Sequence, residues 1–536
     1  MKNFSKVYSA ELEGIEAKLI EVETDINVGL HAFNIVGLAD KALNESKERV
    51  NAALKNSNIK PPNQENRRIT VNLAPADIKK TGSQYDLAIA VGYLLATKQI
   101  KDFDAKNKIF IGELSLEGNL RPVNGVLAIS SLAKNLGFEY VFVPKENAAE
   151  AAIISGVKVI PVSDLDQLIN HLEERNFVTP QAKTELRFNP ESKVDISEIK
   201  GQENAKRALM IAAAGGHNLI MVGSPGAGKT MLAQALVSIL PPLSVNEAIE
   251  VTQIYSSSGV LKETSFITAR PFRAPHHTAS VVSIVGGGAN PRPGEISLAH
   301  RGILFLDEIP EFRRDLLESL RQPLESGTVC VSRAKSILHF PARFTLVAAM
   351  NPCPCGYFGD NEKECKCGAH EVFRYQKKIS GPLLDRIDLQ LEVPRVKVEE
   401  LRKKKEENVT DKIRVKVINA RKIQAERFQK FNNKIYPRAQ GVGNINSGVN
   451  NNKRNNGLGA GVYLNSEMTS KMADQLIDLD NESQMFLKNI LEKSFISARG
   501  YYRILKTART IADLEESEKV FPIHLAEAFQ YRIREN

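Results

Sequence analysis

The segment 223–230 has the residue types and spacing of a phosphate-binding loop. It reads GSPGAGKT, which fits the pattern GxxxxGK[ST], and it lies between the apolar run NLIMV and a helical pattern. Glycines let successive backbone N–H groups point at phosphate oxygens, Lys229 supplies a positive charge, and the Thr230 hydroxyl is a ligand for Mg²⁺. The residues predicted to bind ATP are Gly223, Ser224, Pro225, Gly226, Ala227, Gly228, Lys229 and Thr230.

A second apolar run ends in two adjacent carboxylates. The sequence GILFLDE at 302–308 places Asp307 78 residues beyond Lys229, and Glu308 follows it. An acid at the carboxyl end of a buried parallel strand lies beside the phosphate-binding loop. We therefore predict that Asp307 and Thr230 hold Mg²⁺, and that Glu308 orients and deprotonates a water for ATP hydrolysis.

These side chains must be placed by the strands and helices of a central domain, predicted at 195–395. Within it, apolar runs at 218–222, 302–306 and 344–350 alternate with longer helical patterns. That alternation is typical of a doubly wound α/β domain with a parallel sheet.

The rest of the chain predicts two further domains, so the fold class is multidomain α/β. Residues 1–172 alternate short strands with helices, in an α+β pattern, and a polar stretch with two prolines at 173–194 predicts a linker. Helix formers dominate 396–536, which predicts a helical domain. A Gly/Asn-rich stretch at 441–461 predicts a flexible surface loop inside it.

Composition excludes a disordered chain and favours a cytoplasmic protein without a membrane. The 536 residues are 42% hydrophobic and 25% charged, and no apolar stretch approaches the ~18 residues of a bilayer span. The N-terminus has no apolar signal-peptide region. The net charge of +9 belongs almost wholly to residues 395–536. A positive net charge of this size is compatible with a polyanionic partner and also with simple solubility.

Three further segments resemble motifs of AAA+ ATPases. Asn351, at the end of FTLVAAMN, matches the sensor-1 position that helps to place the attacking water. SGPLLDRIDL resembles the motif in which an arginine, here Arg386, reaches the γ-phosphate on a neighbouring subunit. SARGYYRILKTARTIADLE resembles a sensor-2 helix, with Arg499 as the matching residue and Arg503 as the alternative. An arginine that acts in a neighbouring site implies a ring or filament of subunits.

Longer segments resemble the magnesium-chelatase-like AAA+ ATPases of the ComM/YifB family. They are RPFRAPHHTAS at 270–280, GGGANPRPGEISLAHRGILFLDE at 286–308, NPCPCGYFGD at 351–360 and ITVNLAPADIKKTGSQYDLAIAVGYL at 69–94. The resemblance covers almost the whole chain except the 441–461 loop. It implies a Lon-protease-like (S5-like) N-terminal domain, an AAA+ core and a helical lid. It also implies an ATP- and Mg²⁺-dependent homo-hexamer that drives branch migration of single-stranded or branched DNA during natural transformation.

The resemblance also indicates where DNA would bind. Residues 328–333 and 336–344 can pair as a hairpin like the pre-sensor-1 hairpin, and 270–293 resembles the helix-2 insert that lines the pore of related motors. The DNA-contact candidates are Arg270, Arg273, His276, Arg292, Arg333 and Lys335. Such cations bind phosphates without sequence preference, although cations at a hairpin tip are often merely solvated and adjacent histidines often form local hydrogen bonds.

Two other functions share parts of this sequence. A magnesium-chelatase motor subunit would use the same ATPase core. The family resemblance implies that the chelatase subunit lacks the Lon-like domain that this chain has, which disfavours this alternative. A Lon-like ATP-dependent protease would need a Ser/Lys dyad, whose positions fall on Gln84 and Leu127, with Ser83 one residue before the nucleophile position. Leucine cannot act as the base, so the protease is disfavoured.

Four of the five cysteines lie within fifteen residues. Cys353, Cys355, Cys365 and Cys367 form two C-x-C pairs, which favours a small structural zinc site over free thiols. The fifth, Cys330, lies in an apolar run and is predicted to be a core residue.

Overall fold

The computed structural model describes most of the chain. The described residues are 3–38, 40–64, 66–185, 188, 192–261, 266–288, 291–332, 337–360, 362–402, 408–435, 464–493 and 496–532. The predicted loop 441–461 lies outside them, as do the hairpin-tip candidates Arg333 and Lys335. Among the helices in these ranges, none is both long and apolar enough to cross a bilayer.

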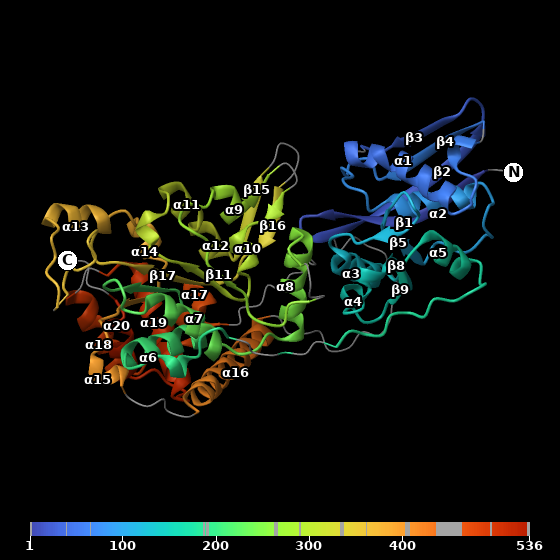
Figure 1. The fold of residues 1–536 in the computed structure, drawn as a ribbon. Helices are drawn as coiled ribbons and strands as arrows, with labels where there is room; N and C mark the ends of the chain where they lie inside the picture. The colour runs from blue at the N-terminus through green and yellow to red at the C-terminus, as the bar shows by residue number, and fades with distance from the viewer. Residues whose placement is uncertain are drawn as a thin grey trace.

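The N-terminal part is built on a seven-stranded mixed sheet (Figure 1). The strands, in sheet order, are β3 (Ala32–Val36), β4 (Arg67–Ala74), β2 (Glu16–Val28), β1 (Phe4–Glu13), β5 (Lys108–Phe110), β8 (Tyr140–Pro144) and β9 (Lys158–Val162). Strands β6 (Glu113–Leu114) and β7 (Leu120–Arg121) form a separate small hairpin. Its helices are α1 (Lys41–Asn56), α2 (Asp86–Ala96), α3 (Val126–Leu136), α4 (Ala148–Ala151) and α5 (Leu165–Leu172). The predicted α+β character is therefore present.

The first half of the predicted linker is held against this part. The hydroxyl of Thr184 donates to the carbonyl of Ala149 at 2.7 Å, and the backbone N–H of Gln181 donates to Val159 at 2.8 Å. These bonds fix the direction in which the chain leaves the N-terminal sheet.

The central part holds a second sheet whose five strands are all parallel. In sheet order they are β11 (Phe272–Arg273), β14 (Ile303–Leu306), β17 (Thr345–Met350), β10 (Leu219–Val222) and β18 (Leu389–Glu392). The three runs that predicted strands at 218–222, 302–306 and 344–350 are β10, β14 and β17, which confirms the parallel α/β sheet. Their near-continuous apolar character reflects helices on both faces.

Alternate residues of these strands enter two different cores. Leu219, Phe305 and Val347 face α6 (Glu203–Gly215), α7 (Lys229–Ile239) and the C-terminal helices. Ile220, Leu304 and other residues of opposite parity face α8 (Val245–Ser258) and the insertions of the other face. Those insertions contain α9 (Val281–Val285), α10 (Glu295–Leu298), α11 (Arg314–Ser319), α12 (Arg321–Ser326), α13 (Ala369–Gln376), α14 (Gly381–Leu384) and the hairpins β12–β13 (Gly286–Gly287, Arg292–Pro293) and β15–β16 (Thr328–Ser332, Ile337–Pro341).

The C-terminal part is helical, as predicted. Its helices are α15 (Val398–Leu401), α16 (Val409–Ile435), α17 (Ser470–Leu476), α18 (Asn481–Lys493), α19 (Ala498–Leu514) and α20 (Pro522–Gln530). Helices α16 and α19 lie beside α6 and share its apolar core, so this part is docked on one face of the parallel sheet (Figure 1).

Helix α8 separates the parallel-sheet part from the N-terminal part and carries their contact (Figure 1). Ser256 of α8 accepts the N–H of Gly125 at 2.9 Å and donates to the Glu150 carboxylate at 2.6 Å. Leu127, Ile249 and Phe266 pack together in the same interface. At a second point, Ile15 in the β1–β2 turn enters the core that holds Phe340 of β16.

A buried carboxylate joins the helices of the C-terminal part. Asp513 is fully buried and accepts hydrogen bonds from Arg427, Arg509 and Asn465. Asp513→Asn should lower the free energy of unfolding of this part by about 3–5 kcal/mol, because two largely buried guanidinium groups lose their counter-charge. Thermal and chemical denaturation would measure the loss.

Asp478→Asn is the matched control for that substitution, since Asp478 is exposed. Its effect should stay within about 0.5 kcal/mol. Equal stabilities for the two variants would contradict the assignment of Asp513 as the electrostatic link between α16 and α19.

Candidate nucleotide-binding site

The phosphate-binding loop follows β10 and opens α7. Gly226 and Gly228 have φ of +80° and +85°, the left-handed region in which a side chain is strained. Gly223 is needed for close backbone packing, because a Cβ at this position would lie 2.3 Å from the carbonyl oxygen of Val393. Helix α7 then starts at Lys229 and presents its N-terminus to the loop, a favourable position for phosphate.

Lys229 is held inside this loop. Its ammonium donates to the carbonyls of Gly223 and Ser224 at 2.6 and 3.0 Å and to the Asn351 side-chain oxygen at 3.1 Å. Burial lowers the pKa of Lys229, and the nearby carboxylates of Asp307 and Glu308 oppose that shift. The predicted partners Lys229 and Asn351 therefore meet, although they are 122 residues apart.

The two predicted carboxylates follow β14 at the same edge of the sheet. The Thr230 hydroxyl donates to Asp307 at 2.9 Å, so the two predicted Mg²⁺ ligands are adjacent. Glu308 has an exposed side chain and φ of +51°, and its N–H donates to Asp307 at 3.0 Å. A non-glycine residue in this backbone region is strained, and such strain concentrates at functional sites.

An open cleft of about 470 Å³ adjoins these residues. It is lined by Glu308, Glu311, Asn351, Pro354, Glu371, Arg374, Tyr375 and Lys378. Burial raises the pKa of Tyr375 to about 12, so this phenol stays protonated. The arrangement joins a cation, a metal-binding hydroxyl–carboxylate pair and a free carboxylate at one edge, which is the set that phosphoanhydride hydrolysis requires.

Sequence reasoning missed Gln202, which holds the loop from the other side. Its amide donates to the carbonyls of Ala227 at 2.9 Å and Pro394 at 3.1 Å. Gln202 directly precedes α6 and has φ of +55°. The glycine at 201 and the helical pattern after it were the available signals, but neither predicts this long-range contact.

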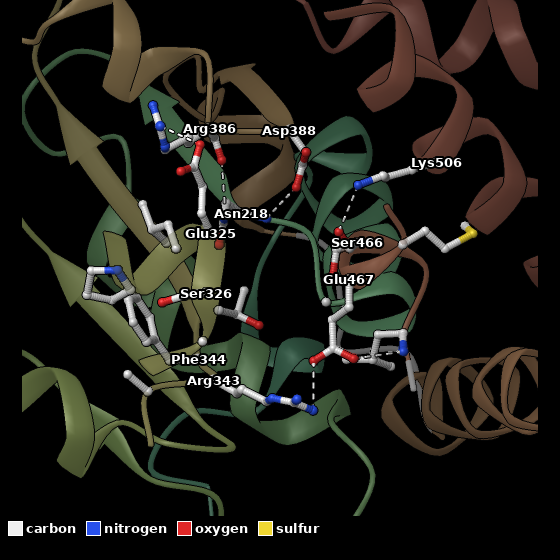
Figure 2. Close-up of a pocket in the computed structure, with 18 of the residues that line it drawn as sticks. Asn218, Glu325, Ser326, Arg343, Phe344, Arg386, Asp388, Ser466, Glu467 and Lys506 are labelled. Atoms are coloured by element: carbon white, nitrogen blue, oxygen red, sulfur yellow. Dashed lines mark hydrogen bonds and ion pairs between the residues drawn. The ribbon is translucent and has the colours of Figure 1, made fainter. Parts of the chain in front are cut away.

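Arg386 lies at the opposite edge of the same sheet (Figure 2). The carbonyl of Arg386 accepts a hydrogen bond from the Asn218 side chain, and Asn218 precedes β10, whereas Gly223 follows it. The four residues of β10 alone separate the two edges by about 13 Å. Arg386 is 5% exposed and donates to Glu325 of α12.

The two sensor-2 candidates differ in their partners. Arg503 forms an ion pair with the buried Asp388, whose pKa falls below its usual range because Arg503 and His217 outweigh the effect of burial. Arg499 is 59% exposed and lies 3.8 Å from Glu325. The structure therefore leaves the Arg499 guanidinium nearer to solvent than that of Arg503.

Arg386, Arg499 and Arg503 line a cleft of about 540 Å³ between the parallel sheet and the C-terminal helices. Figure 2 shows Arg386 with Glu325 on one wall and Glu467 with Arg343 and Lys506 with Ser466 on the others. The cationic lining residues are Arg270, Arg301, Arg343, Arg386, Arg421, Arg499, Arg503 and Lys506, against the anionic Glu247, Glu325, Asp388 and Glu467. The excess of cations suits an anionic group.

Two DNA-contact candidates, Arg270 and Arg273, already have anionic partners within the chain. Arg270 is 8% exposed and donates to Glu247 and to the carbonyls of Pro241 and Arg301, while Arg273 makes two hydrogen bonds to Glu295 at 2.6 and 2.7 Å. Arg273 belongs to β11, an edge strand of the parallel sheet, and Arg270 lies two residues before that strand.

The other candidates have different settings. His276 is exposed and its ring bonds the Thr278 hydroxyl at 2.9 Å, the local bond expected of adjacent histidines, while Arg292 is exposed on β13. The hairpin β15–β16 forms as predicted, with Ser332 paired with Ile337. The prediction of a core thiol at Cys330 is wrong, because its half-buried sulfur contacts His339 and Gln322.

The four clustered cysteines converge on one point. All four sulfurs lie within 4.8 Å of one another, so they could hold a metal ion. The Sγ of Cys353 lies 3.3 Å from that of Cys355 and 3.7 Å from that of Cys365. Only Cys353 of the four is buried.

The positions of a protease dyad are occupied by groups that cannot form one. Gln84 donates to Glu11 at 3.0 Å, and the Ser83 hydroxyl donates to the carboxylate of Glu113. Leu127 is fully buried against Ile249 and Phe266 of the neighbouring part. The Ser83 hydroxyl therefore faces a carboxylate in these contacts, and not the lysine of a Ser/Lys dyad.

Comparison with known proteins places the chain in a family. Family profiles match 195–401 ("Magnesium chelatase, subunit ChlI"), 22–147 ("Subunit ChlI of Mg-chelatase") and 407–532 ("Magnesium chelatase, subunit ChlI C-terminal"). A Haemophilus influenzae relative, "Competence protein ComM", is 41% identical over 98% of this chain and 97% of its own length. The chain belongs to the magnesium-chelatase-like ComM/YifB family. As a member of this family it has an AAA+-type ATPase core and a C-terminal helical part.

Other relatives match either nearly the whole chain or only a part of it. The Escherichia coli member "Uncharacterized protein YifB" is 38% identical over 99% of this chain and 97% of its own length. The "Magnesium-chelatase 38 kDa subunit" of Rhodobacter capsulatus is 27% identical, over 29% of this chain and 49% of its own length. The two relatives named ComM and YifB therefore align along nearly the whole chain, and the chelatase subunit aligns along a portion of it.

Proposed function

We propose that the protein is a Mg²⁺-dependent AAA+ ATPase that acts as a DNA motor, as a hexameric branch-migration helicase in recombination or natural transformation. The observation that carries the ATPase proposal is the meeting of Lys229, Thr230 and Asp307 with Glu308 and Asn351 at one edge of the sheet. Full-length similarity to a competence protein supports the DNA role.

Each residue at that edge has a proposed task. Residues 223–230 bind ATP, with the Lys229 ammonium on the β- and γ-phosphates. Thr230 and Asp307 would hold Mg²⁺, and their adjacency at 2.9 Å fits a shared ion; when bound, the ion neutralises charge on the phosphates. Glu308 is the general base, and Asn351 positions the water.

We propose that Arg386 and Arg499 serve the site of a neighbouring subunit. They lie at the amino ends of the strands, at least the length of β10 from the phosphate-binding loop of the same chain. In a head-to-tail ring this edge faces the next subunit's ATP, which favours a homo-hexamer whose assembly depends on ATP. Arg499 is preferred to Arg503, because Asp388 already neutralises Arg503.

The proposed DNA contacts are reduced to those that are not committed to internal ion pairs. Arg292 is exposed on β13, and His276 is exposed nearby in the chain. Arg333 and Lys335 at the β15–β16 tip remain candidates from the sequence. We propose that single-stranded or branched DNA binds there through its phosphates, without a sequence preference.

Two further assignments complete the proposal. The four clustered cysteines would hold a zinc ion, because thiolates at this mutual distance suit its tetrahedral preference. Residues 1–172 would be a non-proteolytic Lon-like (S5-like) domain, joined through 173–194 to the ATPase core at 195–395 and the lid at 396–536.

A magnesium-chelatase motor subunit is the competing proposal. All three family profiles carry the chelatase name, including the one over 22–147, so the names alone do not decide between the two functions. Coverage favours the DNA motor, since the chelatase relative matches only 29% of this chain.

Forked DNA should accelerate ATP hydrolysis by the purified protein at low salt, and the protein should move the branch point of a model Holliday junction when ATP is present. Binding through phosphates predicts that the stimulation weakens steeply as salt rises. A flat response to DNA at low salt would contradict the motor, while hydrolysis alone would still support the ATPase. Arg292→Ala should reduce the salt slope of DNA binding by about one unit, with the exposed Arg175→Ala as the matched control.

A further inference from the structure

The loop that carries the four cysteines lies directly on the phosphate-binding loop. The Ser224 hydroxyl donates to the carboxylate of Asp360, which lies between the two cysteine pairs. A Cβ on Gly356 would lie 2.6 Å from two ring carbons of Pro225, so the backbone at Gly356 touches the proline of the ATP site. The cysteine loop therefore contacts two of the eight residues in the phosphate-binding motif.

The Asp360 carboxylate is fixed by several groups. It accepts the N–H groups of Glu362 and Lys363 at 2.9 and 3.1 Å, and Arg395 lies 3.4 Å away. Arg395 follows β18 and also stacks over Tyr357, with its guanidinium carbon 5.4 Å from the ring centroid. Asp360 thus joins the cysteine loop, the end of β18 and Ser224.

Two of the sulfur–sulfur distances match a tetrahedral thiolate site, and the Cys353–Cys355 distance of 3.3 Å is shorter. Zn–S bonds of about 2.3 Å in a tetrahedron separate the sulfurs by about 3.8 Å, and the Cys353–Cys365 and Cys355–Cys365 pairs are 3.7 and 3.6 Å apart. The N–H of Phe358 donates to the Cys353 sulfur at 3.3 Å, the kind of bond that stabilises a thiolate ligand.

The contacts of Asp360 hold the middle of this loop, whereas the two cysteine pairs lie at its ends. Phe358 is exposed, and Gly356 and Gly359 take left-handed backbone conformations. A metal bound by Cys353, Cys355, Cys365 and Cys367 would close the two ends of the loop on each other, with Asp360 and its backbone donors between them. Without the metal, the chain entropy of this segment opposes the same arrangement.

We propose that the tetrathiolate metal site controls nucleotide affinity. A thiophilic divalent ion, zinc, holds the cysteine loop so that Gly356 and Asp360 keep Pro225 and Ser224 in the phosphate-binding conformation. This coupling rests on the proposed ATP-binding role of residues 223–230. It makes the ion a positioning element for the ATP site, with no contact to the nucleotide.

The first test compares the zinc-loaded full chain with the zinc-depleted one. Native mass spectrometry should find one zinc per chain. Removing it with a zinc-selective chelator in excess Mg²⁺ should raise the Kd for a fluorescent ATP analogue about tenfold, the weight of one charge-assisted hydrogen bond. Added zinc should restore the Kd, and cobalt in its place should give the absorption bands of a tetrahedral thiolate site.

The second test leaves every cysteine intact. Gly356→Ala should retain zinc and weaken the ATP analogue about tenfold, because the new methyl displaces Pro225. Gly359→Ala is the matched control, since it has the same backbone strain, φ of +76°, with open space around its Cβ. Asp360→Ala should also weaken binding while zinc is retained, and the exposed Glu364→Gln should not.

Each outcome is decisive. Protein that contains no zinc, or that binds the analogue equally well without it, overturns the proposal, as does an equal effect of Gly356→Ala and Gly359→Ala. Zinc-loaded protein that binds no nucleotide overturns both this coupling and the proposed ATPase. Intact coupling with no response to DNA overturns only the DNA motor.

Discussion

Glu308→Gln is expected to bind ATP with unchanged affinity and to hydrolyse it at least about a hundredfold more slowly. The glutamine keeps the size and the hydrogen-bonding oxygen but cannot accept a proton, and a positioned general base contributes roughly 10²–10⁴ in rate. The Glu308 side chain is exposed, while Asp307 beside it accepts a hydrogen bond from Thr230. Steady-state hydrolysis and equilibrium binding of an ATP analogue, measured on the same preparation, separate the two effects.

Glu311→Gln is the matched control for this variant. Glu311 lines the same cleft three residues later and pairs with Lys378 at 3.0 Å. Glu311→Gln should hydrolyse ATP within about twofold of the wild-type rate, because an exposed ion pair contributes little to stability. Turnover by Glu308→Gln above one tenth of the wild-type rate would place the base elsewhere, as would an equal loss in Glu311→Gln.

The parts of this site that the sequence predicts are those encoded by contiguous residues. A phosphate-binding loop needs an apolar strand, its glycines and a helix in one stretch, and the runs before Gly223 and Asp307 carry that signal. Parallel strands are buried on both faces and bring their carboxyl ends to one edge. Lys229, Asp307 and Asn351 therefore converge, as expected from the order of their strands.

What the sequence could not predict depends on partners distant in the chain. Arg270 among prolines and glycines looks like a free cation, but Glu247 and the carbonyls of Pro241 and Arg301 surround it once β11 joins the sheet. The contact of Ser224 with Asp360 spans 136 residues and involves no periodic pattern. Cys330 lies in an apolar run, yet a hairpin with one open face leaves its sulfur half-buried.

Arg386→Ala is expected to lower ATP hydrolysis by about a thousandfold or more, the effect typical of an arginine finger. The loss should appear in turnover while the chain still binds ATP, because the residue lies at the opposite edge from its own phosphate-binding loop. The variant also removes the ion pair with Glu325. A melting curve would show whether Arg386→Ala has a folding defect. Arg386→Lys keeps the positive charge but loses the planar guanidinium group, so it would show whether the defect is catalytic.

Mixing two inactive variants tests whether the arginine acts across an interface. Arg386→Ala subunits have an intact phosphate-binding loop, and Lys229→Ala subunits have an intact arginine. In a random equal mixture about one quarter of the interfaces pair the two intact halves, so about one quarter of the wild-type hydrolysis should return. Mixing Arg386→Ala with the double variant Lys229→Ala/Arg386→Ala supplies loops but no arginine, and it should recover nothing.

Glu325 should compete with the neighbouring subunit's ATP for Arg386 and Arg499. In the single chain this carboxylate pairs with Arg386 and lies 3.8 Å from Arg499, so both guanidinium groups already have an anionic neighbour. A γ-phosphate delivered by the next subunit carries more charge than one carboxylate and would compete for both arginines. Glu325→Gln should therefore increase hydrolysis at low protein concentration, where interfaces are scarce, and have a smaller effect at high concentration. Recovery absent from the mixture, with both variants folded and assembled, would mean that Arg386 does not act in the neighbouring site.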